Sequence, residues 1–248
     1  MTGAALASAP MLASVAGAGT LINVAAVLAG TAIGVALGAR LPAGMQQRVL
    51  AGLGLMTAVI GVDLALAWRE TSALYVLGAV LLGGVIGEAL DIEGRLSRLG
   101  DRLQTRVRRD GAQSTVSEAF FTASLLFCVG PLTVIGSFED GLNGNLEPLA
   151  TKSMLDGFAS IALASTLGIG VAFAALTVLV VQGALTLGAG LFDDLLRGEA
   201  LAAMTSTGGV LIIGIALKLL DLKDVRVGNF LPALVLAPAL VGLVSLVS

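Results

Sequence analysis

Apolar and charged positions separate along this chain on the scale of whole helices, because long apolar stretches are divided by short charged segments. The longest apolar stretch runs from Gly157 to Phe192 without a charged side chain. As one straight helix it would be about 54 Å long, whereas the hydrocarbon core of a bilayer is about 30 Å thick. We therefore expect the stretch to fold back within 165–170, where small and flexible residues make a turn least costly.

The apolar pattern predicts an all-α fold, a polytopic transmembrane helical bundle of about seven or eight spans. The apolar runs are continuous and do not alternate, and backbone polar groups in lipid need partners within their own structure, which favours helices over a barrel. The composition agrees with a membrane protein, since 56% of the residues are hydrophobic and 12% are charged. The expected spans are 19–39, 49–68, 72–90, 116–136, 152–167, 169–190, 205–220 and 228–247.

These spans make residues 1–248 a single transmembrane domain with four parts. The parts are a first three-span unit (19–90), an arginine-rich segment expected in the cytoplasm (91–115), a central broken pair (116–167) and a second three-span unit (169–247). Because a pair separates them, the two three-span units enter the membrane in opposite senses.

The two three-span units also share a weak sequence register. One constant shift superposes Gly30 on Gly183 and Gly61 on Gly214. The pattern predicts an inverted repeat, which is a common build of secondary transporters. Chance matches between glycines in a glycine-rich chain are the alternative.

Basic residues predict the orientation of the bundle, because positively charged loops stay in the cytoplasm. The arginine cluster within 95–109 is the strongest such signal. If 152–190 crosses the membrane twice, Lys218, Lys223 and Arg226 are cytoplasmic as well, whereas a single crossing would place them outside. We therefore expect eight spans with both termini outside, and span 152–167 is short enough for a half-helix or re-entrant segment.

The central pair holds the most unusual local sequence. Gly130-Pro131 lies inside a predicted span, where proline removes a backbone donor and clashes with the preceding turn. The helix should kink or stop and leave carbonyl groups near Phe127 and Cys128 free to bind a cation, a solute or a neighbouring hydroxyl. Ser124, Cys128, Gly130 and Pro131 are therefore candidate substrate-binding residues, unless the break serves only packing.

Charged residues follow this break. Glu139 and Asp140 lie in a glycine- and asparagine-rich stretch that is expected to form a loop on the outer face. Lys152, Ser153 and Asp156 open the following span, where a lysine and an aspartate four residues apart share one helical face. All five are candidate substrate-binding residues, and a structural ion pair at the membrane boundary is the alternative for Lys152 and Asp156.

Polar side chains also lie within other predicted spans, where polarity is costly. Asn23 and Gln182 complete the set of candidate substrate-binding residues, although hydrogen bonds between helices would also explain them. Asp63 and Glu88 lie near enough to the two opposite interfaces to stay hydrated.

The sequence excludes several kinds of chemistry. It contains no histidine, which rules out histidine-ligated metals and histidine-based triads, and Cys128 is its single cysteine, which rules out a disulfide framework. Phosphate-binding loops, dinucleotide fingerprints and metal-ligand clusters are absent. We therefore expect no cofactor, no metal, no catalytic residue and no nucleic-acid partner. The expected partners are the lipid bilayer, a small solute or ion, and further copies of the chain in a homo-oligomer.

Several short segments taken together are characteristic. They are Gly19-Thr-Leu-Ile-Asn23, Ser124-Leu-Leu-Phe-Cys-Val-Gly-Pro131, Ile135-Gly-Ser-Phe-Glu-Asp-Gly141, Lys152-Ser-Met-Leu-Asp-Gly157, Ser165-Thr-Leu-Gly-Ile-Gly-Val171 and Gln182-Gly183. Through them the chain resembles, over nearly its full length, the YqgA/YdfK-like family of bacterial inner-membrane proteins, a domain of unknown function. Leu132 stands where many relatives have methionine, a change that conserves volume. The resemblance implies a multi-pass protein of the bacterial inner membrane and names no substrate.

Three classes of function remain open. A secondary transporter or exchanger of a small polar or ionic solute fits the inverted repeat, the broken helix and the boundary charges. A channel or structural membrane subunit would use the same glycines only for packing. A membrane enzyme that uses Lys152 as the base and Ser153 as the nucleophile has the least support, because adjacent residues point to different faces of a helix.

Overall fold

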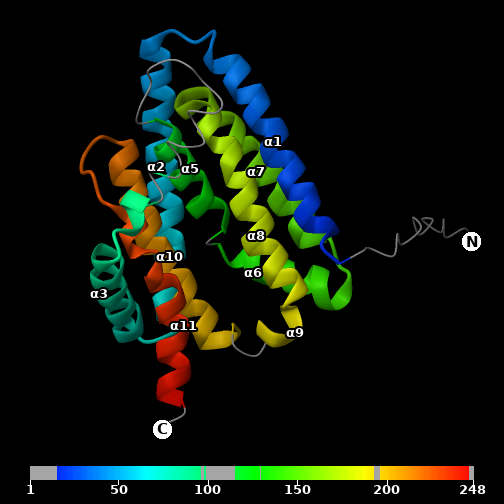
Figure 1. Cartoon of the computed structure of the whole chain (residues 1–248), viewed down its shortest axis with the longest axis vertical. Helices are drawn as coiled ribbons and strands as arrows, with labels where there is room; N and C mark the ends of the chain where they lie inside the picture. Colours follow the sequence, from blue (N-terminus) through cyan, green and yellow to red (C-terminus); the bar gives the residue numbers. More distant parts are fainter. Residues whose placement is uncertain (1–15, 96–97, 99–114, 129, 193–195, 246–248) are drawn as a thin grey trace, which may run out of the picture.

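The computed structural model describes residues 16–95, 98, 115–128, 130–192 and 196–245. Regular structure in these ranges is entirely helical, which confirms the predicted all-α fold (Figure 1). The α-helices are α1 (Ala18–Gly38), α2 (Ala43–Ala65), α3 (Ala73–Ala89), α5 (Thr115–Cys128), α6 (Pro131–Phe138), α7 (Glu147–Leu167), α8 (Ala174–Leu187), α9 (Ala189–Phe192), α10 (Gly198–Leu219) and α11 (Pro232–Ser245). Short 3-10 or π turns are η1 (Leu66–Glu70), η2 (Glu139–Asn143), η3 (Gly168–Phe173) and η4 (Val227–Phe230).

Several helical stretches in the described ranges can cross a bilayer. Five are long and apolar enough, namely 18–38, 44–70, 147–187, 198–219 and 227–245. The pair α5 and α6, bent by 57°, makes six if it counts as one span, and α3 is apolar but shorter. Length and composition therefore support a multi-pass membrane protein but do not confirm the predicted seven or eight spans.

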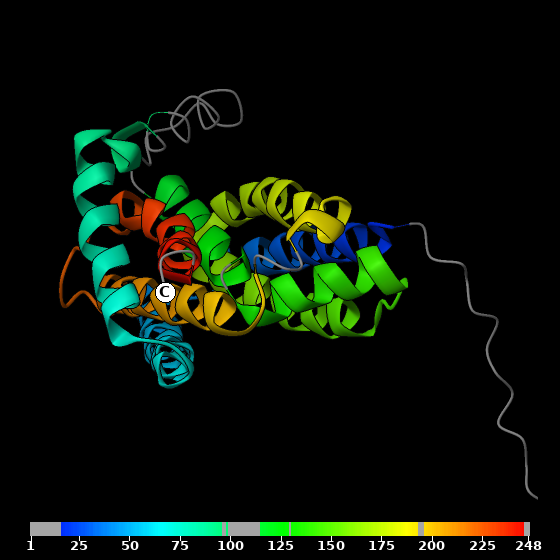
Figure 2. The same cartoon turned by 90° about the horizontal axis from the view of Figure 1, so that it is seen from below.

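The stretch 147–187 is a single run by composition, yet the chain reverses direction within it. Asn23 of α1 donates hydrogen bonds both to Asp156 of α7 and to Gln182 of α8. In one straight helix residues 156 and 182 would lie about 39 Å apart. The reversal occurs at η3, where Gly168 has a φ of +81° that other residues rarely adopt. Figure 2 shows α1 between α7 and α8.

Glycines set how closely α1 packs on α7. The two helices run parallel, with Gly30 against the carbonyl oxygen of Gly157 and Gly38 against the carbonyl oxygen of Ser165. Small residues allow this close approach of two backbones, which is the usual way that helices associate in lipid. The α1–α7 interface is therefore one of backbone contacts and has no room for a methyl group at Gly30.

We expect Gly30→Ala to lower the free energy of unfolding by about 1–3 kcal/mol, because the added Cβ would collide with the Gly157 carbonyl and approach Ser160 Cβ to 2.9 Å. Thermal unfolding of the purified protein measures the loss. Gly52→Ala in α2 is the matched control, since its Cβ would meet nothing within 4 Å. Equal stability of the two variants would contradict this packing.

Two further helix pairs are antiparallel. Gly54 of α2 lies against Leu220 of α10, whereas Gly61 lies against Ile213. Likewise Gly78 of α3 faces Leu240 of α11, whereas Gly83 faces the backbone of Ala233. The cartoon shows both pairs on the side of the bundle away from α1 (Figures 1 and 2).

These pairings place the charged segments at two ends of the bundle. The end that holds the α1–α2 turn and the α10–α11 segment carries Arg40, Lys218, Lys223 and Arg226, and we call it the basic end. At the opposite end the carboxylate of Asp140 accepts the backbone N–H of Gly17, and we call it the Asp140 end. Most of the predicted arginine-rich segment 91–115 lies outside the described residues.

Candidate functional site

Four polar side chains from three helices meet inside the bundle. Asn23 Nδ2 donates to Asp156 Oδ2 and to Gln182 Oε1, at 2.9 Å each. Lys152 Nζ forms an ion pair with the same oxygen of Asp156. All four side chains are buried, with Asn23 and Gln182 fully enclosed. We call Asn23, Lys152, Asp156 and Gln182 the buried polar network.

The ion pair in this network has little other electrostatic support. Lys152 and Asp156 share one face of α7 because four residues make about one helical turn. The helices α1 and α8, which complete the network, contain no charged residue. Each charge therefore depends on the other for compensation, and neutralising only one would strand its partner in an apolar interior.

Two atoms of the network have no hydrogen-bond partner among the described residues. They are Asn23 Oδ1 and Gln182 Nε2. The acceptor oxygen of Asp156 requires the Nδ2 of Asn23 to face it, so Oδ1 must point elsewhere. Gln182 likewise turns Oε1 toward Asn23 and its own NH₂ group away. The network thus holds one buried acceptor and one buried donor that have no partner among the described residues.

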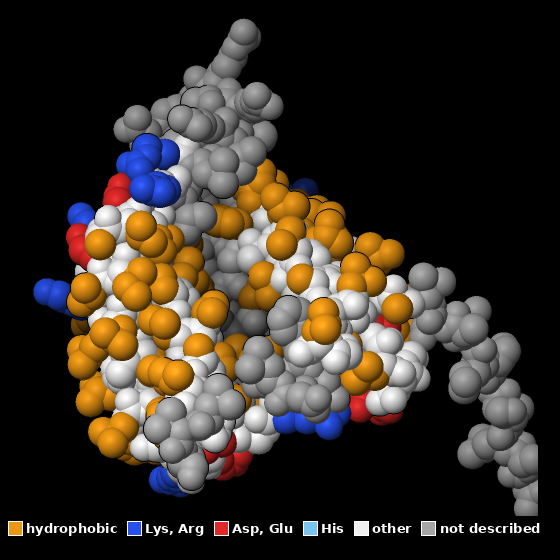
Figure 3. Space-filling model, turned by 60° about the horizontal axis from the view of Figure 1, so that its bottom comes forward, with side chains coloured by type: hydrophobic (Ala, Val, Ile, Leu, Met, Phe, Trp, Pro, Cys, Tyr) orange, Lys and Arg blue, Asp and Glu red, His pale blue; other side chains and the backbone are white. Residues whose placement is uncertain are grey.

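A largely apolar cavity lies beside the break between α5 and α6. Its volume is about 430 Å³, and its polar lining consists of Ser124, Thr177 and Cys128. The hydroxyls of Ser124 and Thr177 are 3.0 Å apart and bond to each other. Cys128 is at the end of α5, which packs against both α7 and α8. Figure 3 shows a hollow near the middle of the molecule with hydrophobic side chains around it.

The break at Gly130-Pro131 ends one helix and gives the Phe127 carbonyl a hydroxyl partner. Gly130 is extended and Pro131 occupies the first turn of α6, so one helix ends and another begins. Thr133 Oγ1 donates to the Phe127 carbonyl at 2.9 Å. Of the expected partners for this carbonyl, the structure therefore shows the neighbouring hydroxyl, which the first turn of the new helix supplies.

The other candidate residues divide between local and longer-range roles. Ser153 donates to the Leu149 carbonyl of its own helix at 2.6 Å, so its hydroxyl does not join the network. Glu139 accepts from Asn143 and Asn145 in its own loop. Asp140 is buried and reaches across to α1. The cavity is lined by Ser124 and Cys128 but by neither Ser153 nor Asp156.

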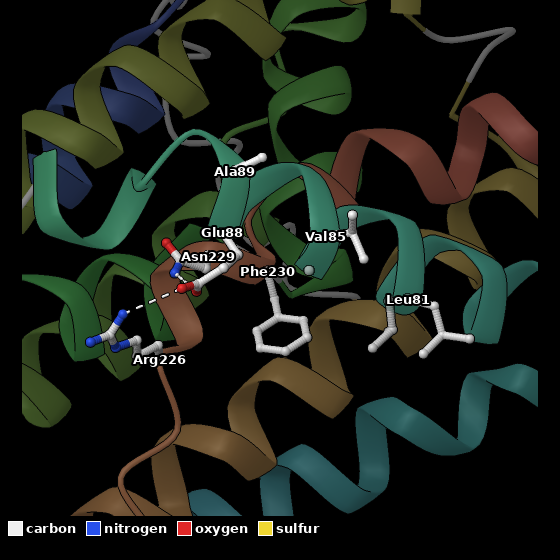
Figure 4. A pocket seen from close by; sticks show the side chains of 9 residues that line it. Leu81, Val85, Glu88, Ala89, Arg226, Asn229 and Phe230 are labelled. Atoms are coloured by element: carbon white, nitrogen blue, oxygen red, sulfur yellow. Dashed lines mark hydrogen bonds and ion pairs between the residues drawn. The ribbon is translucent and has the colours of Figure 1, made fainter.

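A second polar cluster was not predicted from the sequence. Figure 4 shows Glu88 of α3 pointing toward Arg226 and Asn229, beside the apolar side chains of Phe230 and Val85. Glu88 pairs with Arg226 at 3.5 Å and accepts from Asn229 at 2.6 Å. These residues line a cleft of about 460 Å³ between α3 and η4.

Glu93 extends this cluster beyond the end of α3. Its backbone N–H donates to Asn229 Oδ1, and its carboxylate accepts the N–H of Gly228. Partial burial raises the pKa of the Glu93 carboxyl, and the Gly228 N–H partly offsets that shift. The cluster fastens the end of α3 to the segment that precedes α11. In the described ranges no group of three or more acidic or cysteine side chains is placed to hold a metal ion.

Comparison with known proteins agrees with the resemblance carried by the sequence segments. The chain is 31% identical over 225 residues to "Uncharacterized membrane protein YdfK" of Bacillus subtilis, covering 90% of this chain and 95% of that protein. It is 30% identical over 222 residues to "Uncharacterized protein YqgA" of Escherichia coli, covering 88% and 94%. No solved structure gives a significant match. Residues 18–242 match the family described as "Protein of unknown function (DUF554)", so the chain belongs to this family of uncharacterised membrane proteins.

Proposed function

We propose that the protein is a secondary transporter or exchanger of a small polar or ionic solute in the bacterial inner membrane. The buried polar network carries the proposal, because it combines an ion pair with one free donor and one free acceptor inside an apolar bundle. Ionisable and amide groups at membrane depth are costly and commonly belong to substrate or ion pathways. A solute that both donates and accepts hydrogen bonds would satisfy Asn23 Oδ1 and Gln182 Nε2.

The pairing of helices supports alternating access by two related halves. If 19–90 and 169–247 are inverted repeats, α1, α2 and α3 correspond to α8, α10 and α11. Each of these helices packs antiparallel against its counterpart. A two-fold axis in the membrane plane produces such contacts, and rocking of one half against the other would expose a central site to each side in turn.

The discontinuous helix supports the same proposal. The break between α5 and α6 lies next to helices that carry the network, since both α5 and α6 pack against α7 and α8. Broken helices are typical of transporter sites because they bend at low cost and expose polar backbone to a cavity. The cavity next to Cys128 provides space into which α5 or α6 can move.

Ligand-induced thermal stabilisation tests the proposal. Wild type and the double variant Lys152→Met/Asp156→Asn are heated with a panel of amino acids, organic acids and inorganic ions. A compound that binds the network should raise the midpoint of wild type, by the equivalent of about 2.7 kcal/mol at a hundred times its Kd, and leave the double variant unchanged. The double variant removes both charges together, so it should remain folded.

Asp63→Asn is the matched control for this test, because Asp63 is an exposed acid on α2. Stabilisation should survive in this variant. Equal stabilisation of wild type and the folded double variant would place the solute elsewhere. Proteoliposome uptake of the stabilising compound then distinguishes transport from a channel or structural role.

A further inference from the structure

A line of polar side chains leads along the α1–α8 interface from the network toward the Asp140 end. Asn23 and Gln182 are bonded to each other at the network. One helical turn nearer the Asp140 end, Thr20 of α1 and Thr186 of α8 are both buried. Asp140 lies beyond them. We call Asp140, Thr20, Thr186, Asn23 and Gln182 the polar file.

Contacts between backbones hold the parts of this file together. A Cβ on Gly183 would lie 4.0 Å from Thr20 Cγ2, so α8 passes close to that threonine. Gly141, next to Asp140, packs against the backbone of Thr186. Asp140 in turn accepts from Gly17, at the start of α1, at 3.2 Å. The loop that carries Asp140 therefore lies against the end of the α1–α8 interface.

The file contains an unusual concentration of unpaired polar atoms. Eight buried side-chain polar atoms have no hydrogen-bond partner among the described residues, and five of them belong to the file. They are Asp140 Oδ1, Thr20 Oγ1, Thr186 Oγ1, Asn23 Oδ1 and Gln182 Nε2. Leaving a buried polar atom unpaired costs about 1–3 kcal/mol, so five along one interface require a common explanation.

Helix capping explains only part of this arrangement. A carboxylate at the start of α1 is favoured by the free N–H groups and the dipole of that helix. This accounts for Asp140 Oδ2, which accepts from Gly17. It does not account for the second oxygen of Asp140, for either threonine hydroxyl, or for the amide groups deeper in the file.

Water fits the mixture of donors and acceptors better than a bound cation does. A cation requires oxygen acceptors on all sides, whereas Gln182 Nε2 is a donor and Lys152 gives the network a positive charge of its own. A water molecule donates and accepts, and buried waters typically make about three hydrogen bonds to otherwise unpaired groups. Chains of water, hydroxyls and carboxyls are also the usual proton relays of membrane proteins.

We propose that the polar file is a narrow water-filled path that connects the Asp140 end with the Lys152–Asp156 ion pair and lets protons reach Asp156. The path has a carboxylate at each end, Asp140 at the rim and Asp156 at the network. Its use in energy coupling rests on the proposed transport function, with the proton as the coupling ion. Its hydration does not depend on that function and is tested separately.

The groups around Asp156 leave few competing routes for a proton. Lys152 on its own helix is the charged group that bonds to it, and Glu118 on α5 makes no described bond to it. The helices α1, α6 and α8 contain no charged residue. On α2, which also packs against α7, the charged residues Arg48 and Asp63 make no described bond to Asp156.

Silver ion tests the hydration of the path, because Ag⁺ is about as small as a water molecule and blocks thiols. In a Cys128→Ala background, Gln182→Cys and Thr186→Cys probe the file, and Thr205→Cys is the matched control. Thr205 is also buried and has an unpaired hydroxyl, but it lies on α10 away from the file. Proteoliposomes are exposed to silver nitrate in chloride-free buffer, and the remaining thiols are counted by maleimide labelling after denaturation.

Silver should block Gln182→Cys and Thr186→Cys roughly a hundredfold faster than Thr205→Cys. A cation reaches the control only through a dry apolar region, which is a large barrier. Adding Thr20→Val, which keeps the volume and removes the hydroxyl, should slow the blocking of Gln182→Cys. Blocking of both file cysteines at the rate of Thr205→Cys would overturn the proposal. A hydrated path in a protein for which no solute is found would support the path while leaving transport without support.

Discussion

Lys152→Met should lower the free energy of unfolding by about 3–5 kcal/mol, because it leaves the carboxylate of Asp156 buried without its counter-ion. Adding Asp156→Asn should recover much of this loss, since the uncharged amide no longer needs a counter-ion and can keep the contact with Asn23. Thermal unfolding of the two purified variants and wild type measures both effects. The rescue by a second substitution separates an ion pair from general packing damage.

Lys218→Met is the matched control for this comparison. Lys218 pairs with Asp224 at 3.4 Å, but the Asp224 side chain is 78% exposed. Loss of such an exposed pair changes stability by about 0–1 kcal/mol, because water and mobile ions already compensate the charges. Similar losses at Lys152 and Lys218, or a double variant less stable than Lys152→Met alone, would refute a buried, mutually dependent pair.

The residues of the network were recognisable in the sequence, whereas their assembly was not. Lys152 and Asp156 are four apart, so helical periodicity alone predicts that they meet. Asn23 and Gln182 are polar residues in apolar runs, which marks each of them as exceptional. Their bonds to each other and to Asp156 join three separate helices, and spacing along one chain has no information about which helices become neighbours.

Local sequence also predicts where helices break better than it predicts what the break exposes. The reversal near Gly168 and the discontinuity at Gly130-Pro131 follow from backbone freedom and from the missing proline N–H. The partner of the Phe127 carbonyl is Thr133 in the first turn of α6, and the helical segments on the two sides of the break are bent by 57°. That angle is a result of packing and leaves no local signature.

Two helices begin earlier than the predicted spans. The helix α7 begins at Glu147 instead of 152, and α10 begins at Gly198 instead of 205. Hydropathy excludes polar first turns, although acidic residues such as Glu147 and Glu199 are favoured at helix starts by the dipole. The contact of Glu88 with Arg226 was missed for another reason: both side chains are more than 60% exposed, and exposed charges carry little information about their partners.

Labelling of cysteines introduced at the two ends of the bundle should show which end faces the cytoplasm, because each cysteine reacts from one side of the membrane only. The antiparallel packing of α2 on α10 brings Arg40, Lys218, Lys223 and Arg226 to one end of the bundle, and basic loops remain on the cytoplasmic side. In a Cys128→Ala background, Lys223→Cys should therefore react with a membrane-impermeant maleimide only after cells are permeabilised. Leu142→Cys, exposed at the Asp140 end, should react in intact cells.

The two cysteines control for each other, because each is exposed and only their ends of the bundle differ. Labelling of Lys223→Cys in intact cells would mean that the bundle has the opposite orientation, or that it crosses the membrane one time fewer than proposed. If Leu142→Cys were then unlabelled, the whole bundle would be inverted, and the polar file would open to the cytoplasm. If both were labelled, an even number of crossings would separate residues 142 and 223, and the second three-span unit would lose its opposite sense of insertion. The inverted repeat would fail with it, since its two-fold axis requires α2 and α10 to cross the membrane in opposite directions.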